Sequence, residues 1–215
     1  MLSTQTHARR EFVEVLEQLY RERTLTPYLA GRSISLRSEE VVVVCRGVVQ
    51  LFTIQPDGSE TLLGLAGPSA PIGLSLTTVE PYWAQALTDV DVLPLSLAEI
   101  ESSPVLTAGL FRNLTLRLQQ AEAWLALAGK RLVTDRLRHL LMLIAEEFGQ
   151  QEDRGIRISV RLTHHQLATA IGTTRVTVTR LLKDFKDEGW LMTDQRHLIL
   201  RLPQPSPQRR FAHLR

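Results

Sequence analysis

Residues 162–183 read LTHHQLATAIGTTRVTVTRLLK and carry the strongest structural signal in the chain. Apolar residues recur here at the spacing of two short helices. Leu167 and Ile171 share one face of the first helix, and Val178 lies on the apolar face of the second. Gly172 stands between the two helices, where a tight turn needs a backbone conformation that a Cβ atom disfavours. The spacing therefore predicts two helices packed across a turn.

The second of these helices has a basic, hydroxyl-rich outward face. Arg175 and Arg180 fall on the side away from the apolar positions, and Thr174 can cap the free N–H groups that begin the helix. A helix-turn-helix with a basic second helix is the arrangement that enters the major groove of DNA, although other helical hairpins show similar spacing. We expect DNA contacts from ten residues, namely Thr134, Thr163, Thr173, Thr174, Arg175, Val176, Thr177, Thr179, Arg180 and Lys183.

Charge is distributed unevenly along the 215 residues, a length that allows two domains of ordinary size. Residues 1–130 hold 10 Lys and Arg against 14 Asp and Glu, whereas residues 131–215 hold 15 against 9, for a formal net charge of +2. A basic C-terminal module suits contact with phosphates. Without the helix-turn-helix, an uneven surface charge that serves no partner would explain the pattern equally well.

Other classes of protein are disfavoured by what the sequence lacks. The single cysteine, Cys45, excludes a disulfide framework and a Cys-ligated iron–sulfur cluster within one chain. His164 and His165 are adjacent and point to different helix faces, and residues 31–100 contain no histidine, so we expect no metal site, no cofactor and no enzymatic activity. No apolar run approaches the ~20 residues of a membrane span, and the N-terminus lacks a signal peptide. These features predict a cytoplasmic protein without membrane association.

The N-terminal half predicts a helix followed by short strands. Apolar residues at helical spacing indicate a helix over residues 10–30. Short β-rich runs then alternate with turns such as Pro56-Asp57-Gly58-Ser59, and they predict strands over residues 41–45, 48–54, 61–65, 82–87 and 90–95. Strands at this spacing favour a small barrel or roll, with a loose sandwich as the alternative.

A long helix is expected after this roll. Ser96 suits the cap of a short helix through Ile100, and Ser103-Pro104 suits the start of a helix that reaches about Leu127. Apolar residues spaced by three or four form a seam, consisting of Leu110, Leu114, Leu118, Ala121, Leu125, Ala128 and Leu132. A seam of this length favours pairing of two copies into a homodimer, although a helix packed on its own roll would show a similar stripe.

The C-terminal third predicts a winged helix-turn-helix. We expect Thr134 to cap a helix over residues 135–148, a polar loop over 150–155 and a strand over 156–160. Gly189 suits the end of the second helix of the helix-turn-helix, and strands over 191–193 and 197–201 form the wing. The complete prediction is an α+β chain with a sensor-like roll over 1–102, a dimerisation helix and hinge over 103–132, and a DNA-binding domain over 133–215.

This order of elements resembles the Crp/Fnr family of bacterial transcription regulators. The segment TRVTVTRLL at residues 174–182 is most similar to the cyanobacterial global nitrogen regulator branch, whereas the cyclic-AMP receptor branch usually has Glu in place of Val176. The resemblance implies a roll like a cyclic-nucleotide-binding jelly roll, a homodimer on double-stranded DNA, a palindromic GTA…TAC-like site and contact with RNA polymerase at promoters.

The sensor half departs from the family pattern. The family usually places a phosphate-pairing Arg in the turn that here runs from Ile72-Gly73-Leu74-Ser75 to residues 79–82, and this chain has no arginine between Arg46 and Arg112. A buried anion without a cation is costly, so we expect no cyclic-nucleotide binding at this place.

Two residues of the long helix match another effector site of the family. In the nitrogen-regulator branch, 2-oxoglutarate is held partly by an Arg and by a Glu five residues later, a spacing that Arg117 and Glu122 match. An ordinary solvated pair is the alternative. The effector domain is thus degenerate, binds something else or docks a protein. A second function hypothesis is a protein-interaction module whose roll docks a regulatory partner, with DNA contact secondary.

Overall fold

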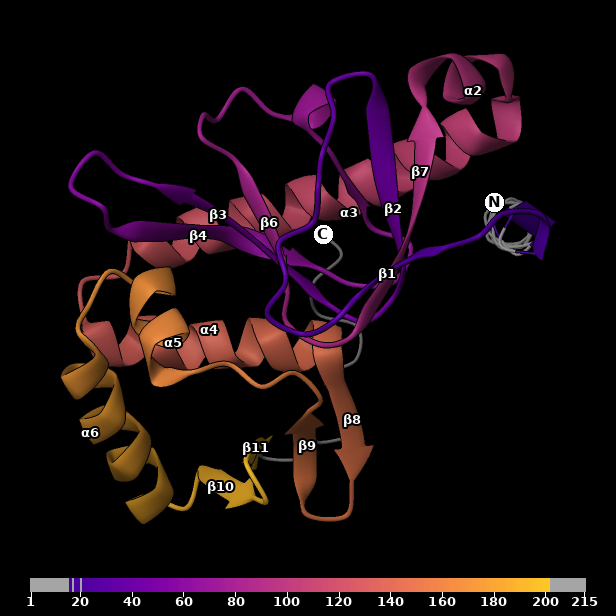
Figure 1. Cartoon of the computed structure of the whole chain (residues 1–215). Helices are drawn as coiled ribbons and strands as arrows, with labels where there is room; N and C mark the ends of the chain where they lie inside the picture. Colours follow the sequence, from indigo (N-terminus) through magenta and orange to yellow (C-terminus); the bar gives the residue numbers. More distant parts are fainter. Residues whose placement is uncertain (1–15, 17, 20, 202–215) are drawn as a thin grey trace, which may run out of the picture.

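The computed structural model describes residues 16, 18, 19 and 21–201. Its N-terminal half is a roll of two antiparallel sheets (Figure 1). One sheet has the order β1 (Thr26–Tyr28), β7 (Val90–Ser96), β2 (Glu40–Arg46) and β5 (Pro71–Ile72). The other has the order β4 (Glu60–Ala66), β3 (Val49–Ile54) and β6 (Trp83–Ala86). A short 3₁₀ turn, η1 (Leu74–Leu76), follows β5.

Strand β2 explains why four valines stand in a row. Val42 and Val44 face the interior of the roll, whereas Val41 and Val43 face a second cluster that contains Leu106 of the long helix. All four are buried, because this strand is covered on both faces. The continuous apolar run therefore positions the long helix against the roll.

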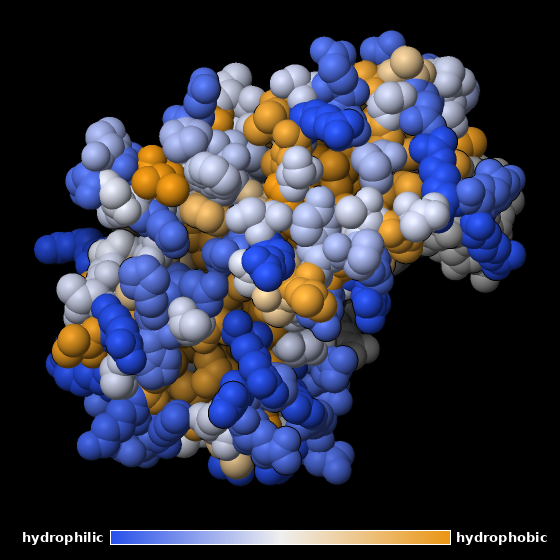
Figure 2. Space-filling view, viewed as in Figure 1, coloured by the Kyte–Doolittle hydropathy of each residue, from blue (hydrophilic) through white to orange (hydrophobic). Residues whose placement is uncertain are grey.

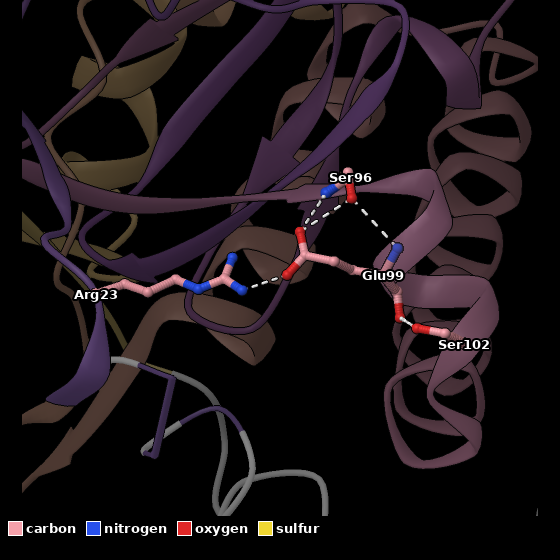
Figure 3. A network of polar contacts seen from close by, with 4 residues as sticks. All are labelled: Arg23, Ser96, Glu99 and Ser102. Carbon is pink, nitrogen blue, oxygen red and sulfur yellow. Dashed lines mark hydrogen bonds and ion pairs between the residues drawn. The ribbon is translucent and has the colours of Figure 1, made fainter.

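Two helices follow the roll and confirm the predicted caps. Helix α2 (Leu97–Ser102) begins with a capping box, in which Ser96 Oγ accepts a hydrogen bond from the Glu99 N–H and the Glu99 carboxylate accepts one from the Ser96 N–H (Figure 3). Ser103 caps α3 (Pro104–Ala128) with Pro104 in its first turn. Figure 1 shows α3 running along the roll.

The C-terminal part is a winged helix-turn-helix, as expected. Its helices are α4 (Val133–Phe148), α5 (His164–Ala170) and α6 (Arg175–Asp187). Its sheet has the order β10 (Leu191–Asp194), β11 (His197–Leu200), β9 (Gly155–Ile158) and β8 (Gly149–Glu152). Gly189 follows α6 with φ of 73°, in agreement with its predicted place past the helix end. The α+β class and the order of roll, long helix and winged helix are confirmed.

Three predictions about elements were wrong. The first helix does not reach residue 30, because β1 begins at Thr26, where the following Pro27 disfavours helical backbone; Phe12 and Val13 lie outside the described residues. Residues 150–155 are not a loop, since they belong to the β8–β9 hairpin at the polar edge of the winged-helix sheet.

Thr134 does not cap α4. Leu132 occupies the cap position with extended backbone, so the helix already begins at Val133 and Thr134 lies inside its first turn. The cap makes no side-chain hydrogen bond. Within the described part of the chain, no helix is both long and apolar enough to cross a membrane.

Candidate nucleic-acid interface

The helix-turn-helix is held by local hydrogen bonds at both of its helix starts. Thr163 forms a capping box with Gln166, in which Thr163 Oγ1 accepts from the Gln166 N–H at 3.1 Å and Gln166 Oε1 accepts from the Thr163 N–H at 2.8 Å. Thr174 caps α6 by accepting from the Thr177 N–H at 3.2 Å. Gly172 takes a φ of 62° in the turn, which confirms the conformation expected there.

The apolar face of α6 fixes the direction in which the helix presents its polar face. Val178 and Phe185 are fully buried in the winged-helix core. The Phe185 ring meets Trp190 edge to face at 5.1 Å between centroids, and the Arg138 guanidinium lies 4.6 Å from each ring centroid. Arg138 also pairs with Glu188 at 2.5 Å. Sequence reasoning missed this contact, because α4 is distant in the sequence.

The outward face of α6 carries cations that no carboxylate neutralises. Arg175, Arg180 and Lys183 are exposed, and within the described part of the chain none of them pairs with a carboxylate within 4.0 Å. Val176 lies beside them with 78% of its surface exposed. Figure 2 shows a largely hydrophilic surface over α6 and the wing, with isolated apolar spots. This face therefore offers free guanidinium groups and one apolar contact.

The threonines of the interface differ in the hydrogen bonds that their hydroxyl groups make within the protein. Thr179 Oγ1 donates to the Arg175 carbonyl at 2.9 Å and lies 2.8 Å from His164 Nδ1, so its hydroxyl group links α6 to α5. Burial, followed by the charges of Arg175 and Lys186, lowers the pKa of His164. Thr173 is half-buried in the turn, and Thr163 is exposed at the start of α5.

A relay of glutamine side chains connects the helix-turn-helix to the roll. Gln166 Nε2 donates to Gln50 Oε1 at 2.6 Å, and Gln50 Nε2 donates to Gln85 Oε1 at 2.8 Å. Gln85 Nε2 donates in turn to the Gly31 carbonyl at 3.0 Å. Gln50 is 3% exposed on the face of β3 opposite to that of Val49 and Leu51, so the relay joins α5 to the outer face of this sheet of the roll.

The two candidate effector residues do not come together within one chain. Five residues along a helix turn the direction by about 140°, and Glu122 is exposed on a different side of α3 from Arg117. Arg117 is half-buried, and burial lowers its pKa. Its Nη1 donates to the Leu65 carbonyl at 3.3 Å. Arg117 and Glu122 thus form no ion pair within one chain, and their role in effector binding stays a prediction.

Arg117 lies at a cavity of about 290 Å³ between the β5–β6 segment of the roll and α3. From the roll this cavity is lined by uncharged side chains such as Ile72, Val79 and Tyr82. Burial raises the pKa of Tyr82, so its phenol stays neutral. No group of three or more His, Cys, Asp or Glu side chains in the described ranges is placed to hold a metal ion.

Comparison with known proteins identifies the family of this chain. A family model of the Crp-like helix-turn-helix domain matches residues 135–205. The regulatory protein CysR of Synechococcus elongatus is 35% identical over 161 residues, which are 74% of each chain. The chain belongs to the Crp/Fnr family. This Crp/Fnr protein is thus a DNA-binding transcription regulator and not an enzyme.

Further similarities of this Crp/Fnr regulator agree with the resemblance to cyanobacterial proteins. The global nitrogen regulator of Synechocystis is 30% identical over 175 residues, which are 77% of this chain and 78% of that protein. A CRP/FNR-family regulator from Thermus thermophilus has a TM-score of 0.66 at 26% identity, over 82% of this chain and 93% of its own. A cyclic nucleotide-binding domain protein from Listeria monocytogenes shares the fold alone, with a TM-score of 0.75 at 14% identity over 87% and 97% of the two chains.

Proposed function

We propose that this regulator binds a palindromic DNA site as a homodimer, with α6 of each copy in one major-groove half-site. The observation that supports the proposal is the set of exposed side chains on α6, where Arg175 and Arg180 have no carboxylate partner among the residues that the structure describes. In such a complex the half-site centres lie about 34 Å apart, because two helices on one face of the duplex are separated by one helical turn of DNA.

The chemistry of the outward face supports a base assignment. Arginine suits bidentate contact with guanine O6 and N7, whereas Val176 offers only an apolar contact, such as one to a thymine methyl group. The family's Glu would favour a cytosine amino group, and its absence removes that preference. A GTA…TAC-like palindrome fits these contacts.

Phosphate contacts fix the register of the helix without reading bases. We assign them to hydroxyl groups near the starts of α4, α5 and α6, namely those of Thr134, Thr163, Thr173, Thr174 and Thr177, and to the ammonium group of Lys183 in the C-terminal half of α6. Thr179 holds His164, so we assign it the alignment of α5 and α6 instead of a phosphate.

An apolar face of α3 supports pairing of two copies. Leu118 is 60% exposed and Leu125 is 75% exposed, and Leu114 lies on the same side of the helix. The ends of the expected seam differ, since Leu110 is buried against the roll and Leu132 lies beyond the end of α3. The usable seam runs from Leu114 to Ala128. Exposed apolar side chains in such a row mark an association surface.

We infer that the effector domain is atypical. Arg117 is the cation at the 290 Å³ cavity, and the roll strands supply none there. Cyclic AMP would therefore bury a phosphate without the partner that the family provides. A role for 2-oxoglutarate has weaker support, because Glu122 does not line this cavity. We also propose a cytoplasmic location and contact with RNA polymerase at promoters.

Selection of DNA sites from a random pool tests the proposal. We expect the wild-type protein to enrich a palindrome with G and T in each half, and Arg175→Ala to lose about 1–3 kcal/mol of affinity and the preference at the guanine. Lys183→Ala is the matched control, since it should weaken binding to all sequences alike. If the wild type and Arg175→Ala return the same site with equal affinity, the assignment of the reading residues is wrong.

A further inference from the structure

A second and larger cavity lies where the roll, α3 and α4 meet. Its volume is about 500 Å³, within the range of small-molecule sites. The β4–β5 loop forms one wall, and Gly67 there lets the Phe148 ring come close, since a Cβ atom at Gly67 would lie 2.8 Å from a ring carbon. Arg117 lines both this cavity and the smaller one, so it stands between them.

Two residues that line this cavity from α3 point away from the seam. Leu116 and Ala123 line it from α3. Each residue of a helix turns the direction by about 100°, so Leu116 and Leu118 point about 200° apart. The side chains of Leu116 and Ala123 therefore point away from Leu118 and Leu125 of the seam.

Opposite charges stand along one wall of this cavity. Arg117 and Glu147 both line it, and neither forms an ion pair with any described residue within 4.0 Å. Gln120 lies between them, because its Nε2 donates to Glu147 while its Oε1 approaches Gly64, next to Arg117 Nη1.

Arg117 and Glu147 attract each other, but the surrounding protein desolvates both charged groups. Glu147 is exposed toward the cavity, yet the surrounding protein raises its pKa, and burial lowers the pKa of Arg117. A ligand that supplies a counter-charge to each group would relieve both penalties. The rest of the wall is largely apolar and aromatic, with Trp124, Leu143 and Phe148.

We propose that this cavity binds a free α-amino acid with an apolar side chain. The ligand carboxylate pairs with Arg117, its ammonium group pairs with Glu147, and its side chain lies against Trp124 and Leu143. Such a ligand contacts α3 and α4 at once, so it would couple the dimer helix to the DNA-binding domain. That regulatory consequence rests on the proposed function, whereas the binding itself does not.

Calorimetry on the full chain without DNA tests the site, with leucine, methionine and phenylalanine as separate probes. We expect at least one of them to bind and to raise the melting temperature. The paired probes 4-methylpentanoate and 3-methylbutylamine, which keep only the carboxylate or only the amine of leucine, should bind at least tenfold more weakly. If no amino acid binds, or if the carboxylate alone binds equally well, the proposal is wrong.

Variants separate the proposed contacts from general effects on folding. Arg117→Met and Glu147→Gln should each weaken amino-acid binding at least tenfold, and Ala123→Met should abolish it by filling the cavity. Ala126→Met is the matched control, because Ala126 is exposed on α3 and does not line the cavity. Unchanged binding in Glu147→Gln would overturn the assignment. Since DNA is absent, these results do not depend on the site selection described above.

Discussion

Val176 places an apolar side chain among the exposed polar side chains of α6. It is 78% exposed on the first turn of α6, between Arg175 and Thr177, whose N–H donates to the capping Thr174. Exposure of a branched side chain at this place has no benefit for the core, which α6 reaches through Val178 and Phe185. This exposure supports the proposed contact with DNA, where a methyl-bearing base would suit an apolar side chain.

We expect Val176→Glu to change the preferred half-site. A carboxylate at this position accepts a hydrogen bond from a cytosine amino group and loses the apolar contact with thymine, so discrimination should shift by about 1–3 kcal/mol. Competitive binding of matched oligonucleotides measures the shift. Val176→Ile is the control, since it keeps the apolar contact and should keep the site. Equal preferences in Val176→Glu and the wild type would contradict this reading of the helix.

Residues differ in how well the sequence alone predicts their roles. Arg175 and Arg180 could be placed on the outward face, because helix periodicity depends only on neighbours in the sequence. The engagement of Thr179 with His164 and the stacking of Arg138 on Phe185 and Trp190 could not, since both depend on how separate helices pack.

Among the elements, α2 shows how one carboxylate serves two purposes. Glu99 closes the capping box with Ser96 and also pairs with Arg23, which precedes β1 (Figure 3). These contacts, with Arg23 first, lower the pKa of Glu99 from its ordinary value of 4.5 to about 2. The folded chain therefore gains stability from this carboxylate above about pH 4.5, and it loses that gain as the pH falls toward 2.

Glu99→Gln should reduce the acid sensitivity of the fold. The amide keeps an acceptor for the cap but loses the charge, so the wild type should lose more stability than the variant between pH 5 and pH 3. Both partners are more than a third exposed, so the expected difference is at most about 1 kcal/mol. Urea unfolding at the two pH values measures it. Glu101→Gln, a change at an exposed residue of the same helix, should leave the pH dependence as it is in the wild type.

Helix α3 allows a second test at this scale. Charges in place of Leu118 and Leu125 would be buried in a paired seam, so the Leu118→Glu, Leu125→Glu double variant should sediment as a monomer with weak DNA affinity. Leu116→Glu is the control on the opposite side of α3 and should remain a dimer. A double variant that still sediments as a dimer would place the interface elsewhere.

The expected helices and strands show where a local sequence pattern is sufficient to predict the structure. The seam stripe was visible in the sequence, but it did not reveal that Leu110 packs on the roll while Leu118 stays exposed, because both fit one periodic pattern. Strand β8 lacked the usual alternation, since it lies at the edge of its sheet and its residues are largely polar.

For the molecule as a whole, the roll and the winged helix share buried structure. Val48 and Leu65 of the roll belong to the same apolar cluster as Leu141 of α4, and the Gln50–Gln166 hydrogen bond adds a polar link. This docking joins segments more than 100 residues apart, so no local pattern in the sequence could predict it. Stability of the two parts is consequently coupled.

Gln50→Met should weaken both parts together. The change leaves the amide groups of Gln85 and Gln166 without their partner, which costs about 1–3 kcal/mol. Hydrogen exchange should then become faster in β6 and in α5 alike. Gln55→Met is the control, because the Gln55 side chain bonds Thr61 within the β3–β4 hairpin and the change should leave α5 protected. Faster exchange confined to the roll would show that the relay does not couple the two parts.

If two copies pair through the exposed leucines of α3, the amount of protein in the cell would also control the level of transcription. When pairing precedes DNA binding, the dimer concentration rises with the square of the chain concentration as long as most chains are single. A twofold change in synthesis then gives about a fourfold change in the species that occupies promoters. Gene dosage and proteolysis would thereby act on transcription through Leu118 and Leu125, without any metabolite.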